Sequence, residues 1–384
     1  MKKLLATLFA AVFLLSAFSS ANAQFLPAPP IAARSWLLLD ASSGQIIASR
    51  DAETRIEPAS LTKLMTAYLT FSALNDKRID LNQAVNVSTR AWKVDPTSSK
   101  MFIEPRTPVT VEDLLYGLIV QSGNDAAVAL AEAVAGDEDS FVIMMNKEAE
   151  RMGMKSTSFA NSHGLPHKDN YSTAFDLSIL AANLIRDYPQ LYKMYSTKEF
   201  TYNRIRQQNR NRLLWVDPTV DGLKTGHTEG GGYSLIATAK RSSAAGERRM
   251  LTVVIGTSSD QMRAQESLKL LNWGFQNFDT VKLYDKGQVI ATPDVWKGSQ
   301  SQVPIGFSRD AYVTVPKGMA ARMKTVLERK DPLIAPFSEN SQVGVLKILV
   351  DEKLVAELPV VALEQVNPAS FLGRLWDTIR LWFK

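Results

Sequence analysis

Ser60 and Lys63 are the first residues along the chain whose types and spacing could do covalent chemistry. A serine hydroxyl becomes an effective nucleophile only when a nearby base takes its proton. A lysine can be that base when burial and the positive end of a helix dipole lower the pKa of its amine. Residues three apart share one face of a helix, so the two side chains can meet. The pair predicts a serine nucleophile with a lysine base, although the same spacing alone also fits an ordinary helix with a solvated lysine.

The segment that follows Ser60 is expected to form the helix that brings these side chains together. Pro58 suits the first turn of a helix, where its missing N–H would have had no partner. Residues 61–74 are rich in Leu, Met, Ala and Tyr and contain neither Gly nor Pro, which favours a helix. We therefore expect a helix over residues 61–74, with the pair at its start.

Two further short motifs lie downstream, Ser-Gly-Asn at residues 122–124 and Lys-Thr-Gly at residues 224–226. Each has an ordinary explanation by itself: Asn124 could cap the next helix, and the second motif could be a strand edge before a glycine turn. Together with Ser60 and Lys63, and in this order, they match the motif triple of class A β-lactamases and penicillin-binding proteins. The triple indicates acyl transfer, which needs a nucleophile, a base, an acid for the leaving amine and oxyanion donors.

The first 23 residues have the pattern of a cleaved secretory signal peptide of bacterial style. Lys2 and Lys3 precede an almost wholly apolar run at residues 4–18, and Ala-Asn-Ala at residues 21–23 is a cleavage site. The apolar run is too short to span a bilayer comfortably. We expect cleavage after Ala23 and a location on the periplasmic side of the bacterial inner membrane.

Composition narrows the remaining classes of function. The chain has 384 residues, 45% of them hydrophobic, which is enough for two domains and a sizeable core. The sequence has no cysteine, and its three histidines show no ligand spacing, so we expect neither a metal nor a cofactor. We expect His163 and His167 to be loop residues. Loss of the two signal-peptide lysines lowers the formal net charge of +5 by two, which gives no argument for nucleic-acid binding.

The order of strands and helices predicts a mixed α/β catalytic domain over residues 24–280. Strands are expected at both ends of this region and helices in its middle, so one sheet should combine segments from both ends. The expected strands lie at residues 36–40, 45–49, 233–240 and 249–257; the expected helices lie at 61–74, 109–120, 125–135, 140–152, 172–187 and 258–277; residues 85–108 are expected to be loop-like.

Two smaller units are expected after residue 280. Residues 281–366 alternate short β-branched runs with Gly and Pro turns, which is typical of a small all-β domain. Residues 367–384 have the pattern of an amphipathic helix, capped by Asn367 and begun by Pro368. Its apolar arc contains Phe371, Leu372, Leu375, Trp376, Ile379, Trp382 and Phe383. We expect residues 368–384 to lie on the inner-membrane surface; a helix docked on its own protein is the alternative.

The motifs and their order resemble those of the low-molecular-mass penicillin-binding proteins, specifically the D-alanyl-D-alanine carboxypeptidases. Residues 121–126, 171–177 and 221–228 also look like patterns of that family, and the resemblance covers essentially the whole chain. It implies a penicillin-binding/β-lactamase-like transpeptidase fold. It also implies hydrolysis of the terminal D-Ala-D-Ala bond of peptidoglycan stem pentapeptides, which releases D-alanine and limits cross-linking, and covalent inhibition by β-lactam antibiotics.

The resemblance implies catalytic roles for the first two motifs. Ser60 would attack the carbonyl of the penultimate D-alanine and become acylated, while Lys63 would take its proton. Ser122 would relay a proton to the departing D-alanine. Asn124 would orient the substrate amide and Lys63.

The third motif is implied to bind the substrate. Lys224 would supply positive charge against Ser122 and the substrate, and Thr225 would bind the terminal carboxylate. The backbone N–H groups of Ser60 and His227 would form the oxyanion hole, where one donor contributes about 2.7–4 kcal/mol.

Arg210 and Asp176 are secondary candidates. A free carboxylate beside the scissile bond needs a cation, and Arg210 could provide it or could pair with Asp176. Asp176 follows Thr173 at the spacing of a capping-box acid, which would make it a structural support of the site. Arg212 stands where that family often has a small residue, and this could alter the groove.

Two alternatives to a carboxypeptidase remain open at this point. A class A β-lactamase would share the chemistry, but it needs a deacylating Glu in a Glu-x-x-Leu-Asn pattern between the second and third motifs. No glutamate between those motifs is followed by Leu-Asn at that spacing. A membrane-associated penicillin-binding scaffold with little catalytic activity is the alternative from another class, and the three intact motifs argue against it.

Overall fold

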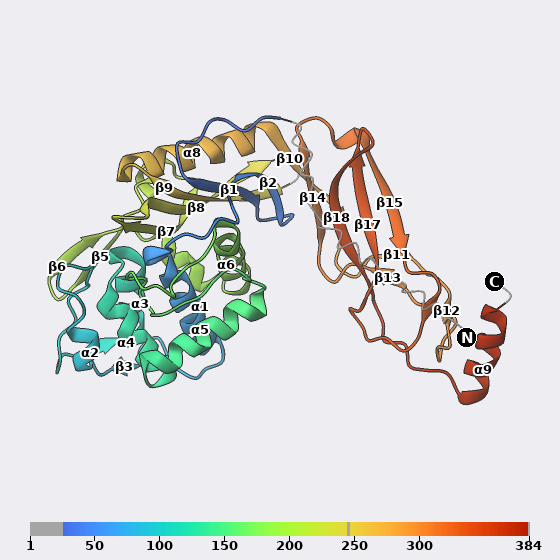
Figure 1. Ribbon diagram of the computed structural model, residues 1–384, viewed down its shortest axis with the longest axis horizontal. Helices are drawn as coiled ribbons and strands as arrows, with labels where there is room; N and C mark the ends of the chain where they lie inside the picture. Colours follow the sequence, from blue (N-terminus) through green and yellow to red (C-terminus); the bar gives the residue numbers. More distant parts are fainter. Residues whose placement is uncertain (1–25, 244–245, 383–384) are drawn as a thin grey trace, which may run out of the picture.

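The computed structural model describes residues 26–243 and 246–382. The predicted signal peptide at residues 1–23 therefore lies outside the described residues, as do Phe383 and Lys384 of the predicted apolar tail. Figure 1 shows two large parts side by side, with a short helix at the far end of the second part.

The first part is built on an antiparallel sheet that combines segments from both ends of residues 24–280, as predicted. The strand order is β2-β1-β9-β8-β7. The bounds are β1 (Ser35–Asp40), β2 (Gln45–Arg50), β7 (Val220–Thr228), β8 (Gly232–Ser243) and β9 (Gly246–Thr257). β7 lies at one edge of this sheet, so one side of the Lys-Thr-Gly motif is free of strand pairing.

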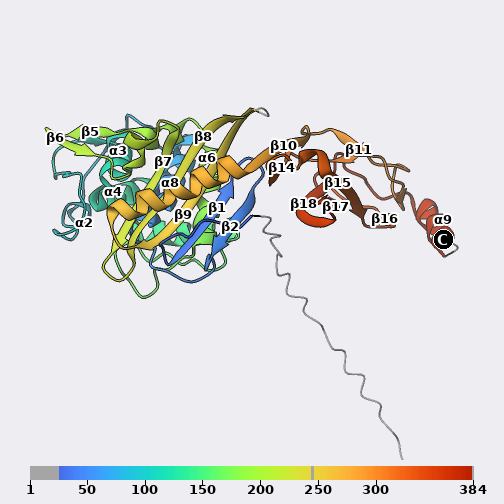
Figure 2. The ribbon, with the colours of Figure 1, turned by 90° about the horizontal axis from the view of Figure 1, so that it is seen from above.

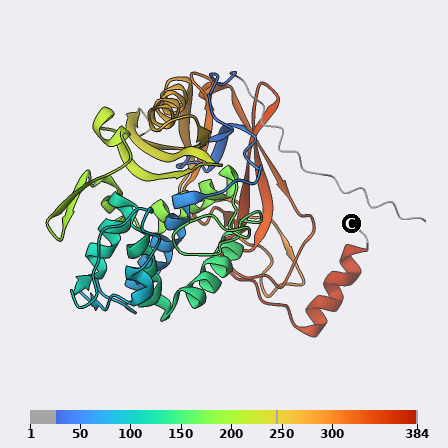
Figure 3. The ribbon, with the colours of Figure 1, turned by 60° about the vertical axis from the view of Figure 1, so that its left-hand side comes forward.

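Helices cover both faces of this sheet (Figures 2 and 3). Strand β1 is buried along its whole length, with Leu37 and Leu39 in one apolar cluster and Trp36 and Leu38 in another. Such alternation is expected for a strand covered on both sides. Helix α8 (Asp260–Asn277) covers one face. The other face carries α1 (Lys63–Asn75), α3 (Val111–Tyr116), α4 (Asn124–Ala135), α5 (Glu138–Met152) and α6 (Ala174–Asp187).

Several predicted boundaries are wrong by a few residues, and local chemistry explains them. The helix expected at 61–74 is preceded by a 3₁₀ turn, Ala59–Thr62. The helix expected at 109–120 begins after Thr110, whose side chain caps it, and then widens into a π-helical stretch, Gly117–Gln121. The helix expected at 172–187 begins after its cap, Thr173.

Short elements fill the connections. The stretch at 85–108, predicted to be loop-like, contains α2 (Thr89–Trp92), which the Ser88 side chain caps. The remaining short elements of the first part are β3 (Ala84–Val85), β4 (Val109–Thr110), a 3₁₀ helix at Leu191–Ser196, β5 (Glu199–Tyr202), β6 (Ile205–Gln208) and α7 (Leu213–Val216).

The second part is all-β, as predicted. A five-stranded sheet has the order β11-β13-β18-β17-β15, while β10 pairs with β14 and β12 with β16. The bounds are β10 (Phe278–Tyr284), β11 (Val289–Ala291), β12 (Val295–Trp296), β13 (Ile305–Gly306), β14 (Ala311–Pro316), β15 (Met323–Arg329), β16 (Leu333–Ile334), β17 (Gln342–Val350) and β18 (Lys353–Ala362), with a 3₁₀ turn at Ala320–Arg322.

Hydrogen bonds join the two parts beyond the chain connection. The Gln45 side chain donates to the carbonyls of Thr314 (3.4 Å) and Val355 (3.0 Å) and accepts from Thr314 N at 2.6 Å. Arg248 donates to the carbonyl of Phe278 at 2.6 Å. These contacts tie strands β2 and β9 to β14, β18 and the start of β10.

The chain continues into α9 (Phe371–Leu381), which begins later than predicted. Ser370, and neither Asn367 nor Pro368, forms its N-terminus, because the Ser370 hydroxyl accepts from Gly373 N at 3.3 Å. Asp377 accepts from Lys297 N at 2.6 Å and fastens the helix to the β-rich part. Its large apolar side chains remain exposed, namely Phe371, Leu372, Leu375, Trp376, Ile379 and Trp382. No helix among the described residues has the length and apolarity needed to cross a membrane.

Candidate active site

Ser60 and Lys63 meet, as their spacing predicts. Ser60 lies in the 3₁₀ turn Ala59–Thr62, and Lys63 is the first residue of α1. Side chains three apart eclipse one another in a 3₁₀ turn, and Lys63 Nζ lies 3.0 Å from Ser60 Oγ. The Lys63 side chain is buried. The local fold therefore places an amine within proton-transfer distance of a hydroxyl.

Two other acceptors surround the Lys63 amine. It donates to Asn124 Oδ1 at 2.7 Å and to the backbone carbonyl of His163 at 2.6 Å. Burial, and to a lesser extent the charge of Arg210, lower the pKa of Lys63 to about 7 against the opposing effect of Asp125. An amine with this pKa can be neutral at neutral pH, which is the state a general base requires.

Ser122 and Lys224 form a second hydroxyl–amine pair. Lys224 Nζ donates to Ser122 Oγ at 2.9 Å, and both side chains are buried. Ser122 has φ +64°, a left-handed conformation that ends the π-helical stretch. Burial, with repulsion from Lys63 and nearby arginines, holds the pKa of Lys224 well below its usual value. A substrate carboxylate beside this amine would favour its charged form.

Asn124 does not cap the helix that follows it. Gly123 occupies the N-cap position of α4, and Asn124 is the first helical residue. Its N–H donates to the Ser99 carbonyl at 2.7 Å, which leaves its side-chain amide beside Lys63. The Asp125 carboxylate accepts from the N–H groups of Met101 (2.9 Å) and Phe102 (2.8 Å), so it anchors the segment that contains Ser99.

Strand β7 approaches the Ser60 turn closely because the third motif ends in glycine. A Cβ at Gly226 would lie 3.2 Å from Leu61 Cγ, 3.3 Å from the Pro58 carbonyl oxygen and 3.4 Å from Ala59 Cβ. A side chain there would be tighter than ordinary van der Waals contact allows. Glycine at this position lets the strand that carries Thr225 and His227 lie against the serine.

All three motifs line one cavity of about 1380 Å³. Its walls include Ser60, Ser122, Asn124, Thr225 and His227. The ring of His227 packs on Tyr233, with the centroids 4.0 Å apart.

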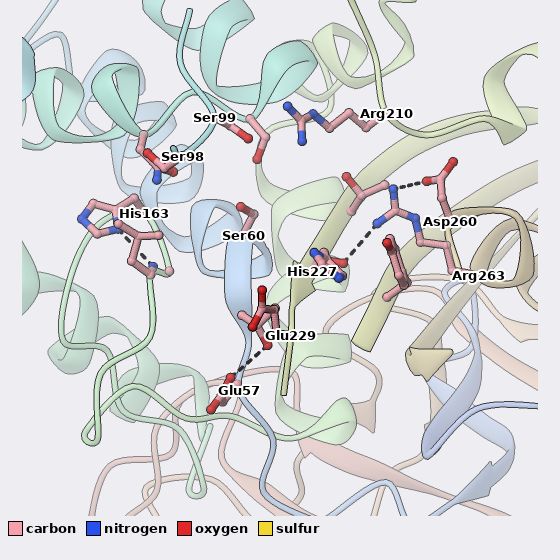
Figure 4. A pocket seen from close by; sticks show the side chains of 18 of the residues that line it. Glu57, Ser60, Ser98, Ser99, His163, Arg210, His227, Glu229, Asp260 and Arg263 are labelled. Carbon is pink, nitrogen blue, oxygen red and sulfur yellow. Dashed lines mark hydrogen bonds and ion pairs between the residues drawn. The ribbon is translucent and has the colours of Figure 1, made fainter. Parts of the chain in front are cut away.

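Charge is unevenly distributed around this cavity (Figure 4). Arg210 and Arg263 lie on one side of Ser60 together with Asp260, which pairs with Arg263, and Glu57 and Glu229 lie on the other side. The cavity can therefore orient a substrate whose two ends differ in charge.

Arg210 and Asp176 do not form the ion pair considered from the sequence. Arg210 lines the cavity, but Asp176 is buried elsewhere and accepts from Ser156 N at 2.8 Å and Thr157 Oγ1 at 2.7 Å. The backbone N–H of Asp176 donates to Thr173 Oγ1 at 3.0 Å. Asp176 therefore has the structural position of a capping acid.

Arg212 lines the same cavity and forms an ion pair with Asp260. The guanidinium is thus held at the rim by a residue of α8. Arg212 therefore adds a positive charge to the cavity wall, at a position where we expected a small residue from the family resemblance.

Sequence reasoning missed Arg263 and the role of the segment around His163. Arg263 comes from α8, lines the cavity and donates to the Gly226 carbonyl at 3.1 Å, so it supports the last residue of the third motif. The contribution of His163 to Lys63 is a backbone carbonyl, which no side-chain pattern reveals. Among the described residues, no group of three or more His, Cys, Asp or Glu side chains is arranged to hold a metal ion.

The chain matches known proteins along nearly its full length. A family model described as D-alanyl-D-alanine carboxypeptidase matches residues 22–259, and one described as the C-terminal domain of penicillin-binding protein 5 matches residues 278–368. The D-alanyl-D-alanine carboxypeptidase DacC of Escherichia coli (strain K12) is 40% identical over 378 residues, which cover 97% of this chain and 94% of the relative.

Solved structures agree with the sequence matches. Penicillin-binding protein 5 from Haemophilus influenzae has a TM-score of 0.82 at 40% identity and covers 89% of this chain and 99% of that chain. Penicillin-binding protein D2 from Listeria monocytogenes, in a cefotaxime-bound form, has a TM-score of 0.59 at 29% identity and covers 65% of this chain and 100% of that chain. The predicted fold class and the resemblance are confirmed: the chain belongs to the D-alanyl-D-alanine carboxypeptidase family of penicillin-binding proteins.

Proposed function

We propose that this D-alanyl-D-alanine carboxypeptidase hydrolyses the terminal D-Ala-D-Ala bond of peptidoglycan stem pentapeptides through an acyl-enzyme on Ser60. The reaction would release D-alanine and leave a shortened peptide. It would limit cross-linking, because a peptide without the terminal D-Ala-D-Ala bond can no longer serve as an acyl donor. The observation that carries the proposal is the convergence of two hydroxyl–amine pairs, Ser60 with Lys63 and Ser122 with Lys224, at one cavity.

Acylation would begin with proton transfer from Ser60 Oγ to the neutral amine of Lys63. A neutral amine has two N–H groups and one lone pair, and the amide oxygen of Asn124 and the carbonyl of His163 can only accept hydrogen bonds. When these two oxygens take both N–H groups, the lone pair faces Ser60. The oxygen of Ser60 would then attack the carbonyl carbon of the penultimate D-alanine.

The leaving amine would receive its proton through Ser122, which Lys224 supports with a hydrogen bond. The carbon–nitrogen bond breaks and free D-alanine departs. The proton that Ser122 passes on would come from Lys63, so Lys63 would be neutral again. Water would then attack the ester on Ser60 while Lys63 accepts a proton from that water. The ester carbon–oxygen bond would break, Lys63 would return the proton to Ser60 Oγ, and the shortened peptide would leave with a free carboxyl group. The backbone N–H groups of Ser60 and His227 would stabilise the negative oxygen in both steps.

Recognition of the free terminal carboxylate would fall to Thr225 and the cations beside it. Lys224 donates to the carbonyl of Thr225 at 3.2 Å. Arg210 and Arg263 lie on the same side of Ser60, and Arg263 is paired with Asp260. The cationic side of the cavity would therefore orient the C-terminal end of the peptide.

β-lactam antibiotics would acylate the same serine as covalent inhibitors. The cefotaxime-bound form of the Listeria relative supports this part of the proposal. Ser60 Oγ would attack the lactam carbonyl and the carbon–nitrogen bond of the ring would break, but the nitrogen stays attached to the acyl group. The free enzyme is restored only when water hydrolyses the ester on Ser60.

We also propose a division of labour along the chain. Residues 1–23 would direct export and be removed, residues 24–280 would form the catalytic domain, residues 281–366 a β-rich domain, and residues 367–384 an anchor on the periplasmic face of the inner membrane. The exposed apolar side chains of α9 support the anchor, since such a helix can bury them among lipid headgroups and acyl chains.

Mass spectrometry of the purified protein tests the proposed activity directly. We expect a penicillin adduct on the peptide that contains Ser60, and release of one D-alanine from a model pentapeptide ending in D-Ala-D-Ala. No release from folded, penicillin-labelled protein would instead indicate a scaffold. Rapid repeated hydrolysis of penicillin would indicate a β-lactamase.

A further inference from the structure

Glu138 is a buried carboxylate with no role in the mechanism above. It is the first residue of α5, and its side chain is 4% exposed. Its Oε1 accepts from Ser162 N at 3.0 Å and Ser162 Oγ at 2.7 Å, while its Oε2 accepts from Arg90 Nε at 3.0 Å. Burial opposes ionisation, yet these hydrogen bonds and the Arg90 charge hold the pKa of Glu138 below its usual value.

Ser162 connects this carboxylate to the surroundings of the catalytic lysine. Its carbonyl accepts from Thr66 Oγ1 at 2.5 Å, and Thr66 lies on α1 one turn after Lys63. The next carbonyl along the chain, that of His163, accepts from Lys63 Nζ at 2.6 Å. Ser162 is fully buried, so water cannot readily replace a lost partner. The position of the His163 carbonyl is therefore determined by a residue that Glu138 and Thr66 hold from two sides.

We propose that Glu138 is a positioning residue for acyl transfer: by holding Ser162, it keeps the His163 carbonyl where that carbonyl aims the Lys63 amine at Ser60. The inference rests on Lys63 being the base in the proposed function. The length of the Glu138 side chain matters here and its charge does not, because the Ser162 contacts need only an oxygen acceptor at the right distance. Its charge is paired with Arg90, which lies on the protein surface.

Two variants of Glu138 distinguish the effect of its side-chain length from the effect of its charge. Glu138→Gln removes the charge but keeps an oxygen acceptor at the same distance from the backbone. Glu138→Asp keeps the charge but shortens the side chain by one methylene, so the carboxylate can no longer hold Ser162 at the present distances. Asp139→Asn is the matched control, because Asp139 is an exposed neighbour that contacts Arg90 at 3.2 Å.

The proposal predicts an unusual order of activities. We expect Glu138→Asp to lower kcat for D-alanine release about tenfold or more, with KM changed less than about twofold, since displacements near 1 Å can cost up to about 100-fold. Glu138→Gln should stay within about threefold of the wild type. Asp139→Asn should be unchanged. An aspartate variant as active as the wild type, or more active than the glutamine variant, would overturn the proposal.

A pH profile distinguishes positioning from a loss of folded protein. Without a well-placed His163 carbonyl the ammonium form of Lys63 loses a hydrogen bond, so the pKa of Lys63 falls and the acid limb of kcat/KM moves to lower pH. The other ionisable groups that face Lys63 stay in place in these variants, namely Asp125, Arg210 and Lys224. A reduced plateau with an unmoved acid limb in Glu138→Asp would contradict the proposal.

The His163 ring also faces Glu138, with Nε2 3.7 Å from Oε1. Burial and the Lys63 charge lower the pKa of His163 to about 4, and Glu138 opposes that shift. The ring is therefore neutral in the range where the acid limb is measured, with or without a carboxylate at position 138. Any movement of the limb reports on Lys63.

Ser162→Ala provides a second route if the aspartate variant does not fold. It removes one of the two hydrogen bonds to Glu138 and should lower kcat about threefold, with the acid limb moved in the same direction. An unchanged kcat and an unmoved limb would overturn the proposal. Failure of the proposed function would look different, because the wild type itself would then not be acylated on Ser60 or release D-alanine.

Discussion

Buried ionisable side chains distinguish the two large parts of the molecule. Before residue 281, the described interior contains Asp40, Lys63, Asp125, Glu138, Asp176, Lys224, Arg248, Arg263 and Glu266. Between residues 281 and 382, all of which the structure describes, the only buried polar side chain is Thr314. A buried charge costs free energy unless it is paired and hydrogen-bonded. In the first part, Lys63, Asp125, Glu138 and Lys224 lie in or beside the site, while Asp40 and Arg248 pair with each other next to the second part. The core of the second part is apolar.

Replacement of Ser60, the proposed nucleophile, should have the largest effect and tests whether the chemistry lies in the first part alone. Ser60→Ala should abolish labelling by a penicillin probe and reduce D-alanine release by about 10⁴-fold or more, because it removes the hydroxyl that is proposed to carry the acyl group. Labelling is measured by mass spectrometry of the digested protein. A control substitution, Ser301→Ala in the β-rich part, should leave both unchanged. Labelling that persists at another residue would contradict the assignment.

The pH dependence of activity tests whether the pKa of Lys63 is lowered in the folded protein. In the proposed mechanism the neutral amine of Lys63 is the active form, and its pKa is lowered to about 7, chiefly by burial. The value of kcat/KM should therefore fall about tenfold per pH unit below pH 7 and level off above it. Measurement between pH 5 and 9 on a peptide without groups that titrate near neutrality checks this. A flat profile from pH 5 to 7 would show that another group is the base.

Core truncations in the two parts should have different consequences for activity. Ile348 and Leu64 are both fully buried, the first in the β-rich core and the second beside Lys63. Replacing either with alanine should lower the free energy of unfolding by about 2–5 kcal/mol. Ile348→Ala should keep kcat within about twofold, while Leu64→Ala should also reduce kcat. Thermal unfolding and peptide hydrolysis, measured on the same samples, make the comparison. Equal losses of kcat would show that the two parts are functionally coupled.

Removal of the tail should have the smallest effect on catalysis. Deletion of residues 368–384 should leave hydrolysis of a soluble pentapeptide unchanged, since α9 lies at the opposite end of the molecule from α1, the helix that begins at Lys63 (Figure 1). It should move the protein from the membrane fraction to the soluble fraction, because the exposed apolar side chains of α9 are lost. Fractionation of cells with and without the tail is the measurement. Unchanged partition would mean that another surface holds the protein at the membrane.

Patterns that lie within a few residues of one another were readable from the sequence. The Ser60–Lys63 spacing, the strand at residues 36–40 and the Thr110 cap each depend on a local pattern or a single side chain. That one sheet combines strands from both ends of residues 24–280 was predicted because these strands surround a helical middle, whereas the strand order was not predicted. The motif order identified the family before any geometry was known.

Features made by distant backbone groups were not readable. The His163 carbonyl reaches Lys63 across 100 residues, and Arg263 supports Gly226 from another helix. A carbonyl has no sequence signature, and an arginine in an amphipathic helix is an ordinary surface residue. The π-helical stretch before Ser122 was missed because its residues have the composition of a regular helix.

The hydrogen bonds of Gln45 have a mechanical consequence. They bridge β2 to β14 and β18, so the two parts are braced at a second place besides the chain connection. If α9 rests on a lipid surface as proposed above, this brace would hold the cavity at a constant distance from that surface. The cavity would then reach stem peptides at one distance from the membrane, and stem peptides nearer to it or farther from it would not be hydrolysed.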